Sequence, residues 1–165
     1  MTALRTVVLS ACLALVAACG SGSAATGSVT ALSEPNVRGF VEAIEASSYT
    51  DQEHEMLDPA LTDDFKITFR EPGEPDVVMD KDEYTQDADI DNVDYQYKVG
   101  DVRVAADGAS ATADVQVTAK FDADGTRVEE SSKAVYTIEL RDGAPKVVAI
   151  ASDSTGLSID GKKQY

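Results

Sequence analysis

The sequence has few of the residues on which several common functions depend. Its two cysteines, Cys12 and Cys19, both lie near the N-terminus, and His54 is the only histidine. Residues 20–165 therefore cannot form a disulfide among themselves or a zinc site of the usual His/Cys type. The stability of this part must come from a hydrophobic core, which a domain of this length can build.

Basic residues are also scarce. The chain has 14 Lys and Arg against 30 Asp and Glu, for a formal net charge of −16. Nucleic-acid binding is disfavoured, because little would neutralise the phosphates. Attraction to anionic lipid headgroups is disfavoured for the same reason. We interpret the acidity mainly as a source of solubility.

The sequence begins with one short apolar run, at residues 6–18. It is too short for a transmembrane helix, which needs about 20 residues. It follows Arg5 and ends in Val-Ala-Ala before Cys19, which resembles the lipobox of bacterial lipoproteins. The resemblance implies a cleaved signal peptide, lipid (diacylglycerol and palmitate) on Cys19, and a place at the extracytoplasmic face of the cell membrane. Ordinary signal cleavage nearby, without lipid, is the open alternative.

Four segments follow from this reading. Residues 1–18 are the signal peptide, and residues 19–32 are the lipidated cysteine with a flexible tether rich in Gly, Ser and Ala. Residues 33–153 form one folded domain, and residues 154–165 are a polar tail.

The domain begins with a helical pattern. Apolar residues follow the spacing of one helical face at Val37, Phe40, Val41 and Ile44. Ser33 can cap the helix, and Arg38, Glu42 and Glu45 are assigned to its outer side. A second helix is expected over residues 51–57, stopped by Pro59, and then a turn or short helix over residues 60–64.

The period then changes to that of strands. Phe65, Ile67 and Phe69 alternate with polar residues, a turn follows at 71–75, and residues 76–79 pair back. Asp80 can cap a third helix over residues 80–87. Alternation predicts four longer strands, at 93–104, 111–121, 134–140 and 146–151, with a β-bulge at Gly100 where the parity slips.

This order, α-α-β-β-α-β-β-β-β, resembles the nuclear transport factor 2-like superfamily, which includes ketosteroid isomerase, scytalone dehydratase and the SnoaL-like polyketide cyclases. The local patterns are GFVEAI, LTDDFKITF and MDKDEY, and the resemblance covers about residues 34–153. It implies an α+β, cystatin-like cone in which N-terminal helices pack in a strongly curved antiparallel sheet. Because many relatives dimerise through the sheet, it also implies that a homodimer is an option.

The resemblance implies a pocket lined from the first helix and the long strands. The aromatic candidates for its lining are Phe40, Phe69, Tyr95, Tyr97 and Tyr136. The same side chains would otherwise fill the core, which is the commoner role of aromatic residues.

Catalytic residues are harder to assign. In the ketosteroid isomerase pattern, the first-helix Tyr falls on Phe40, the basic Asp on Glu71, and the protonated Asp donor near Tyr136. One oxyanion donor is thus missing and the other is changed. Glu71 and His54 are weak candidates for an acid or base, since both fit exposed positions at least as well.

No metal or cofactor site is expected. The acidic run at residues 87–94 begins like an EF-hand loop, but its sixth position is Asn92 instead of Gly and its twelfth is Lys98 instead of Glu.

Three functions stay open on these grounds. The preferred one is a non-catalytic lipoprotein domain that binds a small apolar ligand or a cell-envelope protein. The alternatives are a structural or assembly lipoprotein whose cone is filled, and an enzyme of lyase or isomerase type that uses the cone. An open, mainly apolar cavity would favour ligand binding.

Overall fold

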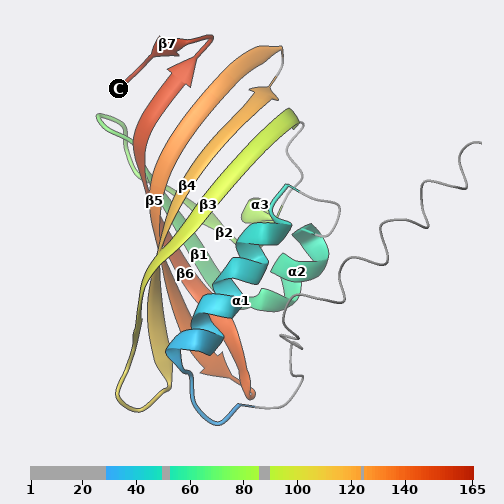
Figure 1. Ribbon diagram of the computed structural model, residues 1–165, viewed down its shortest axis with the longest axis vertical. Helices are drawn as coiled ribbons and strands as arrows, with labels where there is room; N and C mark the ends of the chain where they lie inside the picture. Colours follow the sequence, from blue (N-terminus) through green and yellow to red (C-terminus); the bar gives the residue numbers. More distant parts are fainter. Residues whose placement is uncertain (1–28, 50–52, 86–89, 124) are drawn as a thin grey trace, which may run out of the picture.

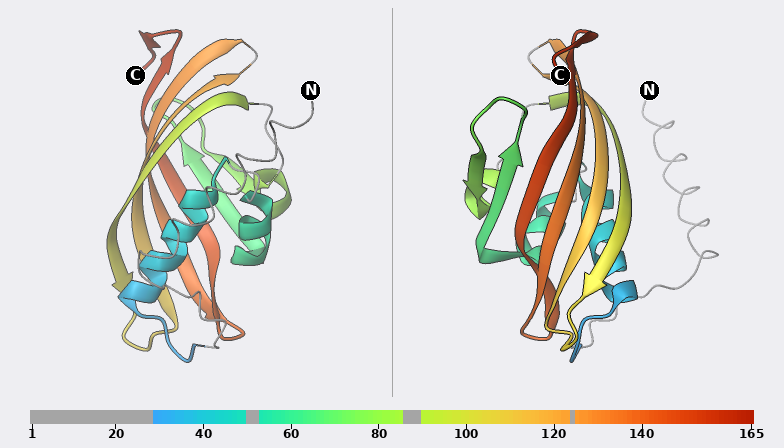
Figure 2. Two further views of the ribbon diagram at one scale, coloured as in Figure 1. Left: turned by 45° about the vertical axis from the view of Figure 1, so that its right-hand side comes forward. Right: turned by 90° about the vertical axis from the view of Figure 1, so that its left-hand side faces the viewer.

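The computed structural model describes residues 29–49, 53–85, 90–123 and 125–165, with side chains except at 53–55 and 90–92. A strongly curved sheet wraps around one side of three helices (Figure 1). The helices lie on the concave side of the sheet (Figure 2). This confirms the expected α+β cone.

Within the described residues, the sheet is continuous and has seven strands. They are β1 (Leu61–Arg70), β2 (Val77–Asp80), β3 (Ile90–Val104), β4 (Ser110–Ala123), β5 (Thr126–Arg141), β6 (Ala144–Ile159) and β7 (Lys162–Lys163). The spatial order is β2-β1-β6-β5-β4-β3, with β7 paired to β6. Neighbours are antiparallel except β1 and β6, which run parallel.

Helix α1 (Glu34–Ser47) has the predicted face. Val37, Val41 and Ile44 are buried, and Phe40 packs against the core from a half-buried position. Ser33 precedes the first turn, where Pro35 is tolerated because its missing N–H would have no partner there.

Helix α2 (Glu53–Ala60) and β1 correct the expectation for residues 58–64, while the expected start at residues 51–52 lies outside the described residues. The helix continues through Pro59, and β1 follows it directly, so no turn or extra helix separates them. Leu57 and Leu61, on either side of Pro59, are both buried, which favours the helix although Pro59 cannot donate a helical hydrogen bond. The pairing of β1 with β6 shifts register between Leu61 and Lys66 of β1. This shift explains why apolar and polar residues do not alternate through the start of β1.

Helix α3 (Lys81–Tyr84) is shorter than expected, although its predicted start is confirmed. Asp80 accepts a hydrogen bond from the Glu83 N–H at 3.0 Å, and Glu83 accepts one from the Asp80 N–H at 3.0 Å. This capping box fixes the first turn. The helix carries Tyr84 to the ring of Phe65, with 5.5 Å between the centroids.

The predicted bulge in β3 is confirmed by a register shift between Val99 and Val102. The guanidinium of Arg38 donates to the carbonyl oxygens of Val99 and Gly100, at 3.2 and 3.0 Å. Arg38 was expected on the outer side of the helix, but its hydrogen bonds connect α1 to the bulge where the sheet bends.

The C-terminal residues also differ from the expectation. Residues 154–159 continue β6 and pair with β5 as far as Val128 opposite Ile159, and β7 then folds back on β6. Of the residues interpreted as a polar tail, 154–159 and 162–163 are strand, because β5 begins at Thr126 and its first half pairs with the extended end of β6. Within the described ranges, no helix is long and apolar enough to cross a membrane.

Candidate functional site

A cavity of about 150 Å³ lies between the end of α1 and the concave face of the sheet. Its floor is made by four small side chains on β4, β5 and β6, which are Ala119, Ser132, Ala134 and Ser152. Strand pairing sets Ala134 opposite Ser152, and Ser152 opposite Phe69. Small residues at the centre of the sheet leave the space that larger ones would fill.

The walls of the cavity are mainly apolar. Aliphatic contacts come from Ile67, Val117 and Ile150. Aromatic rings come from Tyr49, Phe69, Tyr84, Tyr95 and Tyr136. Such a lining with a few polar groups is typical of small-molecule sites in proteins.

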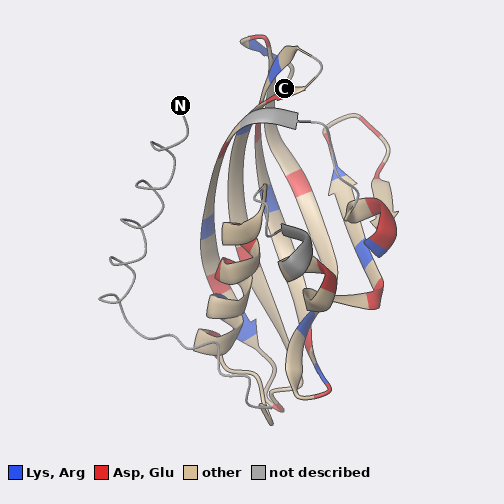
Figure 3. Ribbon diagram, turned by 90° about the vertical axis from the view of Figure 1, so that its right-hand side faces the viewer, with Lys and Arg blue, Asp and Glu red and all other residues tan. Residues whose placement is uncertain are grey.

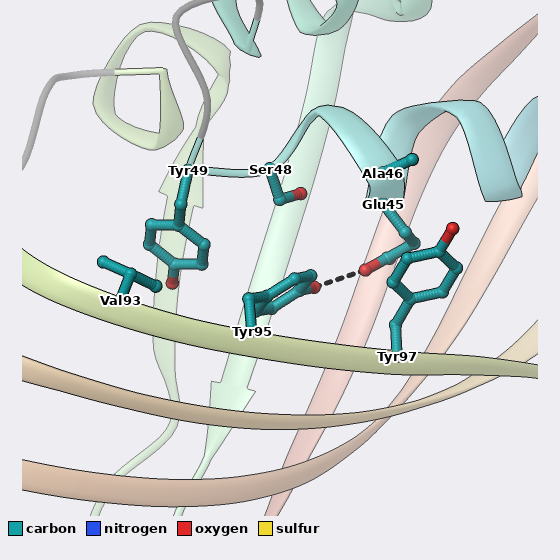
Figure 4. Close-up of a pocket in the computed structure, with 7 residues that line it drawn as sticks. All are labelled: Glu45, Ala46, Ser48, Tyr49, Val93, Tyr95 and Tyr97. Carbon is teal, nitrogen blue, oxygen red and sulfur yellow. Dashed lines mark hydrogen bonds between the residues drawn. The ribbon is translucent and has the colours of Figure 1, made fainter. Parts of the chain in front are cut away.

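Glu45 is the polar centre of the cavity. Its side chain leaves the last turn of α1 and points toward β3, where the Tyr95 hydroxyl donates to Oε2 (Figure 4). The Tyr136 hydroxyl donates to Oε1 from β5. Only 2% of Glu45 is exposed, so the expectation that it lies on the outer side of the helix was wrong. The positions 37, 41 and 45 continue one helical face, and that spacing was the available signal.

The cluster shifts the pKa values of its members. Burial raises the pKa of Glu45, and the hydrogen bonds from Tyr136 and Tyr95 lower it only in part. Burial, together with the Glu45 carboxylate, raises the pKa of Tyr95 and of Tyr136. Both phenols therefore keep their protons at neutral pH and act as donors to Glu45.

A second acidic group, Glu130 on β5, lines the same cavity. Burial raises the pKa of Glu130, and the nearby carboxylate of Glu71 raises it further. Glu71 itself lies exposed in the turn after β1. The acidic pair is therefore at the rim, while Glu45 is inside.

A more open groove of about 270 Å³ adjoins the cavity (Figure 4). The two hollows share Glu45, Tyr49 and Tyr95 as lining residues. The groove is completed by Ala46, Ser48, Val93 and Tyr97. The rings of Tyr49 and Tyr95 are tilted by 59° to each other, with 5.1 Å between their centroids.

Comparison with known proteins rests on structure. No protein-family model and no curated protein matches the sequence. A conserved protein from Planctomyces limnophilus is 17% identical, with a TM-score of 0.57 over 74% of this chain and 95% of its own. A protein from Shewanella baltica, described as nuclear transport factor 2-like and of unknown function, is 9% identical, with a TM-score of 0.52 over 73% of this chain and 91% of its own. The fold is nuclear transport factor 2-like.

A third similar structure carries the name of an activity. It is a candidate aromatic ring hydroxylase from Novosphingobium aromaticivorans, 12% identical, with a TM-score of 0.57 over 76% of this chain and 91% of its own. At this identity, likeness shows the nuclear transport factor 2-like fold alone, and function must be argued from the site.

The structure brings together part of the predicted lining of the cone. Phe69, Tyr95 and Tyr136 line the cavity, and Tyr97 lines the groove. Phe40 packs against the core and lines neither hollow. The sequence interpretation missed the acidic members, Glu45 and Glu130, because it sought the pocket among aromatic residues.

Of the catalytic and lipid candidates, only Glu71 has a described side chain. Glu71 is at the rim. The side chain of His54 and the whole of Cys19 lie outside the described residues, as do residues 87–89 of the acidic run and the side chains of residues 90–92. Within the described part of the chain, no group of three or more His, Cys, Asp or Glu could hold a metal ion.

Proposed function

We propose that this protein is a lipid-anchored, extracytoplasmic lipoprotein whose cone binds a small, largely apolar molecule and does not transform it. The observation that carries the binding role is the cavity under α1, with its floor of small side chains and its aromatic walls.

The size of the cavity supports a small ligand. A cavity of about 150 Å³ in a protein core holds a molecule of the size of benzene. The adjoining groove would accept a substituent that extends past Tyr95 toward solvent.

The hydrogen bonds argue for binding without catalysis. Isomerases of this fold need a donor for the oxyanion that forms on the substrate. Each phenol has a single O–H donor. The hydroxyls of Tyr95 and Tyr136 both donate to the carboxyl group of Glu45. Neither phenol has a second proton with which to stabilise an oxyanion.

The anchor is supported by the sequence alone. Arg5, the apolar run at 6–18 and Cys19 after Val-Ala-Ala fit a lipoprotein signal, and the Gly/Ser-rich residues that follow fit a tether. Held in this way, an acidic domain would stand off an anionic bilayer and meet small molecules in the envelope.

Native mass spectrometry of the full chain, purified from its own host in a mild detergent, tests the binding role. We expect a reproducible mass increment that disappears on denaturation. Ala134→Leu, which fills the floor of the cavity, should abolish the increment. The matched control, Val135→Leu, adds a methylene on the neighbouring exposed residue and should keep it. A bare chain at its calculated mass in every preparation would contradict the proposal.

A further inference from the structure

The hydrogen-bonding groups of the cavity accept more than they donate. A carboxylate offers about four lone-pair positions. In Glu45 the phenols of Tyr95 and Tyr136 use one position on each oxygen, which leaves acceptor capacity and no donor. Glu130 adds a second acceptor at the rim. The hydroxyls of Ser132, Ser152, Tyr49 and Tyr84, which also line the cavity, can donate or accept, and so they set no preference.

The charges around the cavity have one sign. Glu45 and Glu130 line it, Glu71 approaches Glu130 from the turn after β1, and no Lys, Arg or His among the described residues lines it. Helix α3, which brings Tyr84 to the cavity, carries Asp82 and Glu83, drawn in red in Figure 3, and one basic residue, Lys81, which pairs with Asp58 at 2.9 Å. An anionic group in this cavity would be repelled, whereas a cation would reduce the repulsion among the carboxylates.

The rings supply a second attraction for a cation. Five aromatic side chains line the cavity, from α1's end, β1, α3, β3 and β5. The face of a phenol or phenyl ring attracts an organic cation, and sets of such rings recognise alkylammonium groups. Apolar walls, aromatic faces and buried acceptors together suit a molecule with an apolar body and a positively charged N–H donor.

We infer that the ligand of the cone is a small organic ammonium, whose apolar part lies on the floor of Ala119 and Ala134 and whose nitrogen is directed to Glu45. This inference rests on the proposed binding function and specifies the class of ligand. The carboxylates of Glu130 and Glu71 attract the cation at the rim, and Glu45 holds it inside.

Isothermal titration calorimetry of the full chain in lipid nanodiscs tests the inference. Three probes share a size close to that of the cavity and differ in charge, namely benzylammonium, benzyl alcohol and benzoate. We expect benzylammonium to bind about tenfold or more tightly than benzyl alcohol, and benzoate not to bind measurably. Empty nanodiscs provide the blank.

Two conservative variants locate the charge. Glu45→Gln should lower the affinity for benzylammonium by about tenfold and leave that for benzyl alcohol nearly unchanged. Glu130→Gln should give a smaller loss, since Glu130 is less buried. The matched control is Glu129→Gln, at the adjacent exposed residue that pairs with Lys120 at 3.6 Å, which should change neither affinity.

The outcomes separate the two proposals. Equal affinities for benzylammonium and benzyl alcohol would overturn the ammonium inference and leave ligand binding standing. Binding of none of the three probes would overturn both. If Glu129→Gln lowered the affinity for benzylammonium as much as Glu45→Gln does, the attraction would come from the overall negative charge of the protein. That result would also overturn the inference.

Discussion

Glu45 shows how one residue sets the character of this interior. It carries a carboxyl group into a core of aliphatic and aromatic side chains, where charge is costly. Two phenols reduce that cost, and within the described residues no buried side-chain polar atom lacks a hydrogen-bond partner. The stability of the fold and the chemistry of the cavity therefore depend on the same three side chains.

Removing one phenol should destabilise the protein. Tyr136→Phe takes the donor from Oε1 of Glu45 in a buried site, and we expect a loss of about 1–3 kcal/mol in the free energy of unfolding, measured with urea. Tyr97→Phe is the control, because Tyr97 is exposed and its hydroxyl donates to the Glu42 carbonyl at 3.3 Å. That variant should stay within about 0.5 kcal/mol of the parent. Equal losses in the two variants would contradict the role of the cluster.

The raised pKa of Glu45 predicts a pH dependence of stability. The folded protein holds this proton more tightly than the unfolded chain does, so the contribution is fully present below the ordinary value of 4.5 and is lost as pH rises through the raised pKa. In Glu45→Gln this loss is absent. The stability of the variant relative to the parent should therefore increase with pH, by at most about 1.4 kcal/mol per pH unit within that window.

Urea unfolding of both proteins at a series of pH values measures this difference. Val135→Ala, which changes no ionisable group, serves as the control and should differ from the parent by a constant amount. A constant difference for Glu45→Gln as well would show that Glu45 has the same pKa in the folded and unfolded chains.

At the scale of elements, the approach to α1 depends on the hairpin between β3 and β4. Gly108 lies in that turn with φ of +67°, and its carbonyl accepts a hydrogen bond from the Leu32 N–H at 2.8 Å. A Cβ at Gly108 would lie 2.6 Å from the Cβ of Ala31. The turn therefore fixes where the chain enters the helix that carries Glu45.

Gly108→Ala should be costly for two reasons, the positive φ and the collision with Ala31. Gly125→Ala is a matched control, because Gly125 has φ of +76° and open space around it. In both variants, alanine in the left-handed backbone conformation should lower the free energy of unfolding by about 1–2 kcal/mol. We expect Gly108→Ala to lose roughly a further 1 kcal/mol from the collision, measured by urea unfolding. Similar losses would mean that the contact with Ala31 relaxes without cost.

At the scale of the whole molecule, the proposed position at the membrane depends on Cys19. Cys19→Ser should abolish incorporation of labelled palmitate and move the protein from the membrane fraction to the soluble fraction of the envelope. Cys12→Ser is the control, since Cys12 lies inside the proposed signal peptide. This variant should still incorporate labelled palmitate and remain in the membrane fraction. Membrane association that persists in Cys19→Ser would contradict the lipid anchor.

Local patterns in the sequence were enough to predict most elements of the domain. The series Val37, Val41 and Ile44 has the period of a helix, and Phe65 and Ile67 have that of a strand. These periods follow from backbone geometry between near neighbours, so one sequence suffices to read them. Errors arose where remote pairing decides, as in residues 154–159, which are strand because the first half of β5 needs a partner.

The sequence by itself thus determined most of the elements and their order, the bulge at Gly100 and the aromatic residues available to a pocket. The spacing of positions 37, 41 and 45 made an inward Glu45 possible, but only the tertiary structure decided that it is buried, because the curved sheet extends around α1 to cover that position. The cavity was decided in the same way, since strand register sets Ala134 beside Ser152 and so gathers small side chains from distant positions. Local periodicity carries no information about which strands become neighbours, and that is the physical reason the site could not be read before the fold.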